Sequence, residues 1–269
     1  MIEHLNRAAA PFSDELWQRI DAIAVEAARD RLTGRRFLPV KGPYGVGFTA
    51  MEVGPDDYVR PHSADEAGVV AGRALPVAML HQSFQLSIRR VVAHESGGQP
   101  FDLNAVEDAA DAVARREEEL IYQGLKEVGQ AGLLAGPGVL KQDGGDWGDL
   151  DQVIGDVLAA ITRLEQAGFP GPYTLVLAPA LYNGLFRRYA HTEMLQVQHL
   201  GRICQRGLYK AAVKGAAVID PRAATLLLGS DLRAGYVGQD GVHHQLYLRE
   251  SLLLQVNDAD AVCVIGAKG

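Results

Sequence analysis

Residues 41–76 read KGPYGVGFTAMEVGPDDYVRPHSADEAGVVAGRALP. Glycine and proline interrupt every helical pattern in this stretch, and short β-forming pieces such as Val46–Val53 lie between the interruptions. A glycine-rich stretch of this length is hard to place inside one compact core. Two interpretations remain open from composition: an extended arm that lies on a neighbouring chain, or a mobile surface loop.

Regular elements are predicted on both sides of this stretch. Before it, Ser13 is a favoured N-cap, and apolar residues recur at helical spacing until Gly34 ends the helix near Leu32. After it, residues 77–92 alternate as a strand does, with apolar and polar side chains on opposite parities. The stretch is therefore bounded by a helix and a half-buried strand.

The longest predicted helix begins at Asn104 and ends at Gly129. Asn is a favoured N-cap, and Glu107 stands three residues later, as in a capping box. At 1.5 Å per residue the helix would be about 35 Å long. The charged run Arg115–Glu119 is interpreted as its solvated face, and its three glutamates as surface residues rather than a catalytic pair.

The second half of the chain mixes helices and strands. A helix is predicted from its N-cap Asp149 to Gly168, then a strand over Tyr173–Ala178, then a helix from Pro179 to about Tyr189. The chain is thus expected to be α+β. An Asp240-Gly241 hairpin turn lies among the strands predicted after residue 223: Ala224–Leu228, Gly235–Gly238, Gln245–Arg249, Leu252–Val256 and Ala261–Ile265.

Composition narrows the class of protein. The 269 residues are 48% hydrophobic and carry a net charge of -7, values of a globular chain without the basic surface that nucleic acid requires. No apolar run reaches the ~20 residues of a membrane span, and the N-terminus is not of signal-peptide type. Cys204 and Cys263 are expected to be reduced thiols. We expect a cytoplasmic protein that binds neither nucleic acid nor membrane.

No motif for catalysis, metal binding or cofactor binding is found. Glycine-rich phosphate loops, zinc motifs and nucleophile elbows are absent. His243 and His244 would point to opposite faces of a strand and cannot chelate one metal. Asp146, Asp149 and Asp151 could hold a cation through their oxygens, although Asp149 is more simply an N-cap. We expect no enzyme activity, no metal and no cofactor.

Several motifs, in order along nearly the whole chain, resemble those of the encapsulin family of shell proteins. They are Ala10-Pro11, Trp17, Ile20-Asp21, Leu32, Arg35-Arg36, Gly42-Pro43-Tyr44-Gly45, Ile121-Tyr122-Gln123-Gly124, Gly171-Pro172-Tyr173-Thr174-Leu175-Val176-Leu177, Gly229-Ser230-Asp231-Leu232-Arg233-Ala234-Gly235-Tyr236 and Leu246-Tyr247-Leu248-Arg249-Glu250-Ser251. The resemblance implies a capsid fold of the tailed-phage (HK97) type. It also implies a shell subunit that assembles with itself into an icosahedral compartment, most simply T=1 with 60 copies.

The family's architecture implies how the chain divides. The expected parts are an N-terminal helix with the start of a peripheral domain over 1–40, an extended arm over 41–76, and a peripheral domain with its spine helix over 77–132. An axial domain over 133–222 and a C-terminal β-segment over 223–269, which returns to the peripheral domain, complete the chain.

The resemblance also implies a cargo and leaves alternatives. The cargo would be a ferritin-like iron-storage enzyme or a peroxidase with a C-terminal targeting peptide. A phage major capsid protein is the alternative in structure. The acidic charge of this chain counts against packaged DNA, and its early first helix counts against an N-terminal scaffolding segment. A protease or bacteriocin-like protein is an alternative of another class, with no supporting motif.

The chain departs from the family in three places. Some members stack a flavin on a tryptophan, but the matching stretch here is Ser87-Ile88-Arg89-Arg90, so flavin binding is not carried over. Many members have Glu-Asp near the spine helix end, where this chain has Arg116-Glu117-Glu118-Glu119. The segment 187–201 also differs from the commoner pattern.

Two sites follow from the resemblance. Ala28, Leu32, Arg35 and Ala234 match positions that receive the targeting peptide; alternatively, Leu32 is core and Arg35 is merely surface. His191, Thr192 and Glu193 match a loop that lines the five-fold pore. Five histidines around a channel would change its electrostatics between roughly pH 5 and 7; alternatively, the loop is an exposed turn without a gating role.

Overall fold

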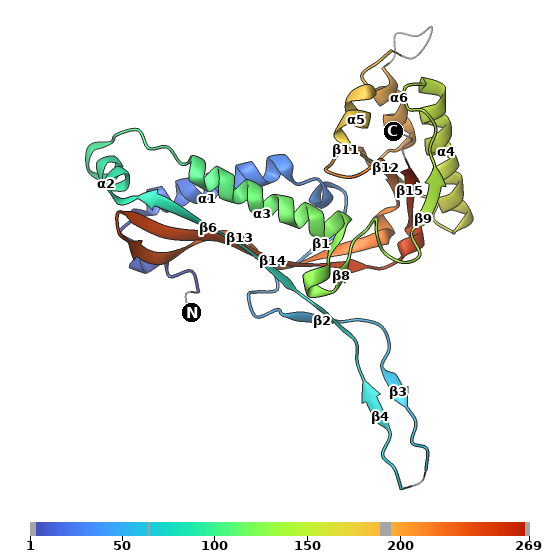
Figure 1. Cartoon of the computed structure of the whole chain (residues 1–269), viewed down its shortest axis with the longest axis horizontal. Helices are drawn as coiled ribbons and strands as arrows, with labels where there is room; N and C mark the ends of the chain where they lie inside the picture. The colour runs from blue at the N-terminus through green and yellow to red at the C-terminus, as the bar shows by residue number, and fades with distance from the viewer. Residues whose placement is uncertain (1–3, 64, 189–194, 267–269) are drawn as a thin grey trace.

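The computed structural model describes residues 4–63, 65–188 and 195–266. Figure 1 shows an elongated layer in which two helices cover one face of a sheet. The sheet has the strand order β1-β13-β14-β6. The elements of this layer are α1 (Asp14–Arg31), β1 (Val40–Lys41), β6 (Ala78–Ser87), α2 (Ile88–Gly97), α3 (Asn104–Tyr122), β13 (Ala224–Asp240) and β14 (His243–Val256).

A second unit stands at one end of this layer (Figure 1). Its sheet has the order β11-β10-β12-β15-β9, and every residue of β10 and β12 is buried, so the sheet forms the centre of its own core. The elements are β9 (Leu140–Asp143), α4 (Leu150–Gln166), β10 (Thr174–Leu177), α5 (Pro179–Gly184), α6 (Gln196–Ile203), β11 (Leu208–Lys210), β12 (Ala216–Ile219) and β15 (Val262–Gly266).

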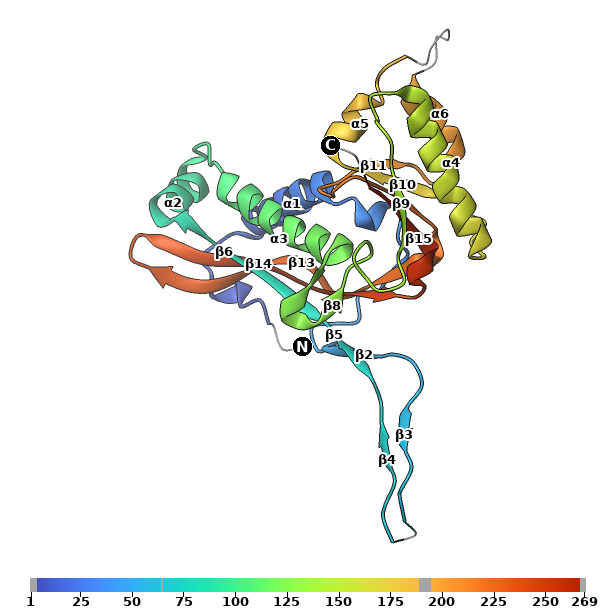
Figure 2. The same cartoon turned by 45° about the vertical axis from the view of Figure 1, so that its right-hand side comes forward.

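The glycine-rich stretch forms a narrow hairpin that projects from the layer, as Figures 1 and 2 show from two sides. In it β2 (Ala50–Glu52) pairs with β5 (Ala74–Pro76), and β3 (Asp57–Val59) pairs with β4 (Val69–Ala71). The exposed apolar residues of its outer part are Tyr58, Val59, Val69 and Val70. The stretch is therefore an extended hairpin, and its contact with a neighbouring chain stays a prediction.

The first helix begins and ends where the sequence predicts. The Ser13 hydroxyl accepts a hydrogen bond from the Leu16 amide at 3.1 Å, and the helix closes at its C-cap Leu32. The alternation predicted for the next strand is also confirmed, since Leu80, Phe84 and Leu86 of β6 are buried. That strand stops at Ser87, where α2 begins.

The predicted end of the long helix is wrong. Asn104 is the first residue of α3 rather than its N-cap, and α3 ends at Tyr122, not at Gly129. Gly124 has φ +80, and a Cβ on it would lie 2.3 Å from the Gln130 carbonyl oxygen, so the chain turns tightly there. Two short paired strands, β7 (Gly124–Leu125) and β8 (Gln130–Ala131), follow instead of helix. Likewise α5 ends at Gly184 rather than near Tyr189.

The first four short strands predicted after residue 223 are in fact one long hairpin, whereas the fifth, Ala261–Ile265, is confirmed as β15 of the other sheet. β13 and β14 run antiparallel almost from end to end, with irregularities between Leu228 and Gly238 that made the pattern look broken. The Asp240-Gly241 turn is confirmed, and Gly241 has the left-handed φ of +57. The two strands of this hairpin are the central strands of the sheet, so side chains on both of them lie against α1 and α3.

A buried histidine makes the fold sensitive to acid. His244 on β14 is almost fully buried, packs edge-on against Phe12 at 4.9 Å, and its Nδ1 lies 3.2 Å from the Tyr236 hydroxyl. Burial lowers its pKa below the ordinary value, because the charged imidazolium loses its water. The folded chain therefore binds this proton more weakly than the unfolded chain does.

Stability should consequently fall as the pH drops below about 6.5, where an unfolded histidine takes up its proton. We expect the melting temperature to decline between pH 7 and 5, and to decline less in His244→Gln, which keeps a polar partner for Tyr236. The exposed His81→Gln serves as the control. Equal slopes in the wild type and His244→Gln would show that His244 is not responsible.

Candidate functional site

A cavity of about 330 Å³ opens beside the C-terminal half of α1, and we call it the α1 pocket. Three of the four residues predicted for peptide docking line it: Ala28, Leu32 and Arg35. Ala234 does not, because it is fully buried in β13, where its carbonyl oxygen accepts a hydrogen bond from Arg7 Nε at 2.9 Å. The other lining residues are Val25, Arg29, Arg36, Asp231, Leu232 and Glu250.

The pocket has an apolar side. Val25 is 42% exposed, while Ala28, Leu32 and Leu232 are buried and pack into the core. Leu32 is thus a core residue that also lines the cavity, and its part in peptide docking stays a prediction. A partner that covers Val25 would bury an apolar side chain that the isolated chain leaves in water.

The pocket has a charged side formed by Arg35, which is not a surface residue. Arg35 belongs to η2 (Gly34–Arg36), and its side chain is 19% exposed. Its Nε and one terminal nitrogen bind the two oxygens of Glu117 at 2.6 and 2.7 Å. The same terminal nitrogen binds Glu250 at 2.7 Å, and the other binds Asp231 at 2.8 Å. We call these four residues the Arg35 cluster.

Burial and charge act against each other in this cluster. Burial works to lower the pKa of Arg35, but the hydrogen bonds and charge of Glu117, with the charge of Glu250, raise it. Burial raises the pKa of Glu250 well above its ordinary value, and the nearby Glu117 charge adds to that. Asp231 is half-exposed; burial opposes its ionisation, but the bond to Arg35 prevails and lowers its pKa.

The interpretation of Arg115–Glu119 as a solvated face is wrong, because Glu117 and Glu118 are both buried. Glu118 accepts hydrogen bonds from the amides of Thr33 and Gly34 at 2.8 and 3.0 Å and from the Thr33 hydroxyl. Two consecutive glutamates of α3 therefore hold the turn that follows α1. Burial raises the pKa of Glu118 above its ordinary value, although these donors oppose the change.

One sequence signal could have found part of the cluster. On β14, Leu246, Leu248, Leu252 and Leu254 share the inward parity, and Glu250 occupies the middle position of that series. A glutamate in an otherwise apolar inward row indicates a buried carboxylate with a partner. Glu117 carries a similar signal on α3, because it lies four residues after Val113 and four before Ile121 in the apolar row of that helix.

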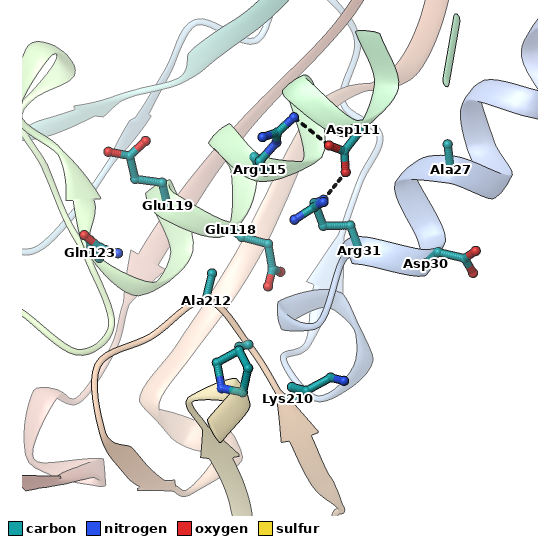
Figure 3. A pocket seen from close by; sticks show the side chains of 12 residues that line it. Ala27, Asp30, Arg31, Asp111, Arg115, Glu118, Glu119, Gln123, Lys210 and Ala212 are labelled. Carbon is teal, nitrogen blue, oxygen red and sulfur yellow. Dashed lines mark hydrogen bonds and ion pairs between the residues drawn. The ribbon is translucent and has the colours of Figure 1, made fainter. Parts of the chain in front are cut away.

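A larger cavity of about 570 Å³ lies on another side of α1, between α1, α3 and residues 210–212 (Figure 3). In it the Asp111 carboxylate bridges Arg31 and Arg115, so these charges largely satisfy one another. Glu118 lines this cavity, whereas its neighbour Glu117 binds Arg35. The turn after α1 thus separates the two cavities.

Among the described residues, the other predicted site residues form no second functional site. His191, Thr192 and Glu193 lie outside the described residues. Within the described ranges no group of three or more metal-ligating side chains gathers, and Asp149 caps α4 through a hydrogen bond from the Asp151 amide at 3.0 Å. Cys204 and Cys263 are free and buried, and burial raises the pKa of Cys204 to about 12.

The fold is that of capsid and virus-like particle proteins. A virus-like particle protein from Pyrococcus furiosus superposes with a TM-score of 0.73 at 18% identity, covering 93% of this chain and 99% of that chain. The capsid protein of the Myoviridae phage XM1 gives a TM-score of 0.60 at 16% identity, with coverages of 87% and 90%. The class that the structure defines is thus that of proteins with the capsid-type fold.

The family within that class follows from the sequence comparisons. The family model described as "Encapsulating protein for peroxidase" matches residues 2–253. The type 1 encapsulin shell protein of Myxococcus xanthus is 29% identical over 282 residues, covering 100% of this chain and 98% of that protein. The chain belongs to the encapsulin family of shell proteins. No helix in the described part of the chain is long and apolar enough to cross a membrane.

Proposed function

We propose that this chain assembles into a closed icosahedral nanocompartment of 60 copies in a T=1 arrangement and encloses a cargo enzyme. The observation that carries the proposal is the arm, whose Tyr58, Val59, Val69 and Val70 are each more than half exposed in the isolated chain. Closed symmetry lets every arm bury such a surface on a neighbour. The parts named in the sequence analysis, an axial domain, a peripheral domain and an arm, fit the two sheet units and the hairpin.

The cargo is a protein with a C-terminal targeting peptide, and a peroxidase or a ferritin-like enzyme is the first candidate. The family description names peroxidase as the encapsulated protein of the family. The shell subunit itself is structural and performs no catalysis, and the compartment is cytoplasmic. Electron microscopy of the purified chain should show uniform closed particles, and the ratio of absorbance at 260 and 280 nm should show no nucleic acid. Packaged DNA would instead favour a phage capsid protein.

The α1 pocket receives the targeting peptide. An extended peptide can place alternate apolar side chains in pockets while its backbone lies along the surface. Val25, Ala28 and Leu32 supply an apolar wall. Arg35 and its half-exposed hydrogen-bond partner Asp231 supply a charged wall. The predicted pore loop around His191 would admit small substrates to the enclosed enzyme.

Val25→Asp should reduce cargo loading without preventing shell formation. Fully burying an apolar side chain contributes about 1.5–3 kcal/mol, so losing this contact and burying a charge should weaken docking at least ~tenfold. Because Val25 is 42% exposed in the isolated chain, the substitution leaves the core intact. Loading is measured by co-expression with a fluorescent protein that carries the candidate peptide.

Val92→Asp is the matched control, since Val92 is also exposed but lies on α2, away from the pocket. It should load like the wild type. If Val25→Asp shells form and load normally, the peptide docks elsewhere. If both variants fail to load, the effect comes from added surface charge and not from the pocket.

A further inference from the structure

Two buried carboxyl groups meet on one nitrogen of Arg35. Glu117 of α3 is fully buried and Glu250 of β14 is 2% exposed, and each has an oxygen 2.7 Å from the same guanidinium nitrogen. Burial and the nearby Glu117 charge both raise the pKa of Glu250. Two ionised carboxylates on one guanidinium nitrogen would leave an uncompensated negative charge in this buried cluster, so a proton on one of them is favoured.

We propose that Glu117 and Glu250 share one proton in the floor of the α1 pocket, and that this proton controls peptide docking. Docking is then tighter at the lower pH values at which the proton is bound, and weaker at the higher pH values at which it is lost. The inference about docking rests on the proposed function of the pocket, whereas the shared proton stands on the geometry of the cluster alone. Two buried carboxylates that meet on one guanidinium nitrogen cannot both ionise at ordinary cost.

The surrounding charges do not remove the need for this proton. On β13, the half-exposed Asp231 is paired with the other terminal nitrogen of Arg35. On α3, Glu118 accepts hydrogen bonds from Thr33 and Gly34. Arg36 donates to the carbonyl oxygens at the end of α1. The pocket's other cation is Arg29, an exposed residue on α1. One guanidinium therefore stands among three carboxyl groups, two of them buried.

Docking affects this proton because a docked peptide removes water from the cluster. Glu250 is almost fully buried, so the displaced water lies over Arg35 and the half-exposed Asp231, which also line the pocket. Without that water, the excess negative charge of the ionised cluster costs more free energy. Covering the pocket therefore favours the protonated form, and by reciprocity the protonated form favours docking. Above the pKa of the pair, each pH unit should weaken docking by up to about tenfold for one linked proton.

The same proton affects the stability of the chain. Because the folded chain holds it more tightly than the unfolded chain, its stabilising effect is complete below the ordinary glutamate pKa of about 4.3. The effect is lost as the pH rises through the raised pKa of the folded pair. The melting temperature of shells should therefore fall on the alkaline side in the wild type and fall less in Glu250→Gln, a neutral isostere of the protonated residue.

The shared proton is tested without any peptide. Infrared difference spectra of shells at neutral pH should contain the carbonyl band of a protonated carboxyl group, and Glu250→Gln or Glu117→Gln should remove it. Glu118→Gln separates any band from the other buried glutamate, and Glu107→Gln, an exposed residue of the same helix, should change nothing. A band that persists in both Glu250→Gln and Glu117→Gln, or is absent from the wild type, overturns the shared proton.

Docking is tested with a fluorescein-labelled decapeptide of alternating leucine and serine, measured by anisotropy from pH 6 to 9. Affinity should fall with pH for the wild type and Glu107→Gln and stay level for Glu250→Gln. A level wild-type profile, or one that falls equally in Glu250→Gln, overturns the coupling. If the decapeptide binds no shell, the proposed docking at this pocket loses its support, while the infrared and melting results still decide the proton.

Discussion

Arg35→Met is expected to destabilise the folded chain by about 3–5 kcal/mol, the range for removing one partner of a buried charge cluster. The substitution keeps an unbranched apolar stem but leaves Glu117 and Glu250 without a cation, and both are almost fully buried. It also removes one of the two links between η2 and α3, while the link through Glu118 remains. Soluble yield and the midpoint of denaturant unfolding measure the effect.

Arg73→Met is the matched control. Arg73 pairs with Asp57 on the arm, but both side chains are more than half exposed, so water replaces the lost partner and the midpoint should barely move. A rescue variant tests the cause: Arg35→Met combined with Glu117→Leu and Glu250→Leu removes every buried charge and should regain much of the loss. An Arg35→Met midpoint equal to that of the wild type would mean that the cluster is dispensable.

Replacing residues 54–73 by a short Gly-Asn-Gly turn should abolish particle assembly while the chain stays folded. The deletion keeps the base of the arm, where β2 and β5 pair, and removes β3 and β4, whose residues are all exposed. Few contacts within the chain are lost, but the apolar surface for a neighbour disappears. We expect the sedimentation of a small species, lighter than the 28.9 kDa of the full chain, in place of large particles.

The matched variant keeps the hairpin and changes only its apolar side chains. Val59→Thr, Val69→Thr and Val70→Thr preserve β-branching and the backbone pairing of β3 with β4. Assembly should weaken without being lost, because a threonine buries less apolar surface than a valine. If the shortened chain still forms closed particles, the arm does not hold the shell together. A shortened chain that fails to fold would instead place the arm within the folding unit.

Local patterns predicted much of the architecture. The Ser13 cap, the alternating strand with Phe84, the Asp149 cap and the Asp240-Gly241 turn depend on residues close in sequence, and the structure has each of them. The family motifs then indicated the capsid fold, which the structural comparisons confirm. The predicted end of the long helix failed although its cause is local, because Gly124 turns against the carbonyl of Gln130 and a short hairpin follows Tyr122.

The candidate site also contains residues that could be predicted from the sequence and residues that could not. Ala28, Leu32 and Arg35 are near one another in sequence at the end of a predicted helix, so their meeting in one pocket was accessible to sequence reasoning. Ala234, which the same family resemblance placed in the site, is inside the sheet. The charged partners of Arg35 were missed because they come from residues 117, 231 and 250, and because the run of charges around Glu117 was interpreted as a solvated face.

The sequence by itself determined where several helices and strands begin, that residues 41–76 leave the core, and to which family the chain belongs, because caps, glycines and apolar periods act over a few residues. The tertiary structure alone decided the ionisation of the site. A charge is stabilised or opposed by what surrounds it within a few ångströms. Glu117 is buried only because η2 folds back over α3 and brings Arg35 against it, across more than eighty residues of chain.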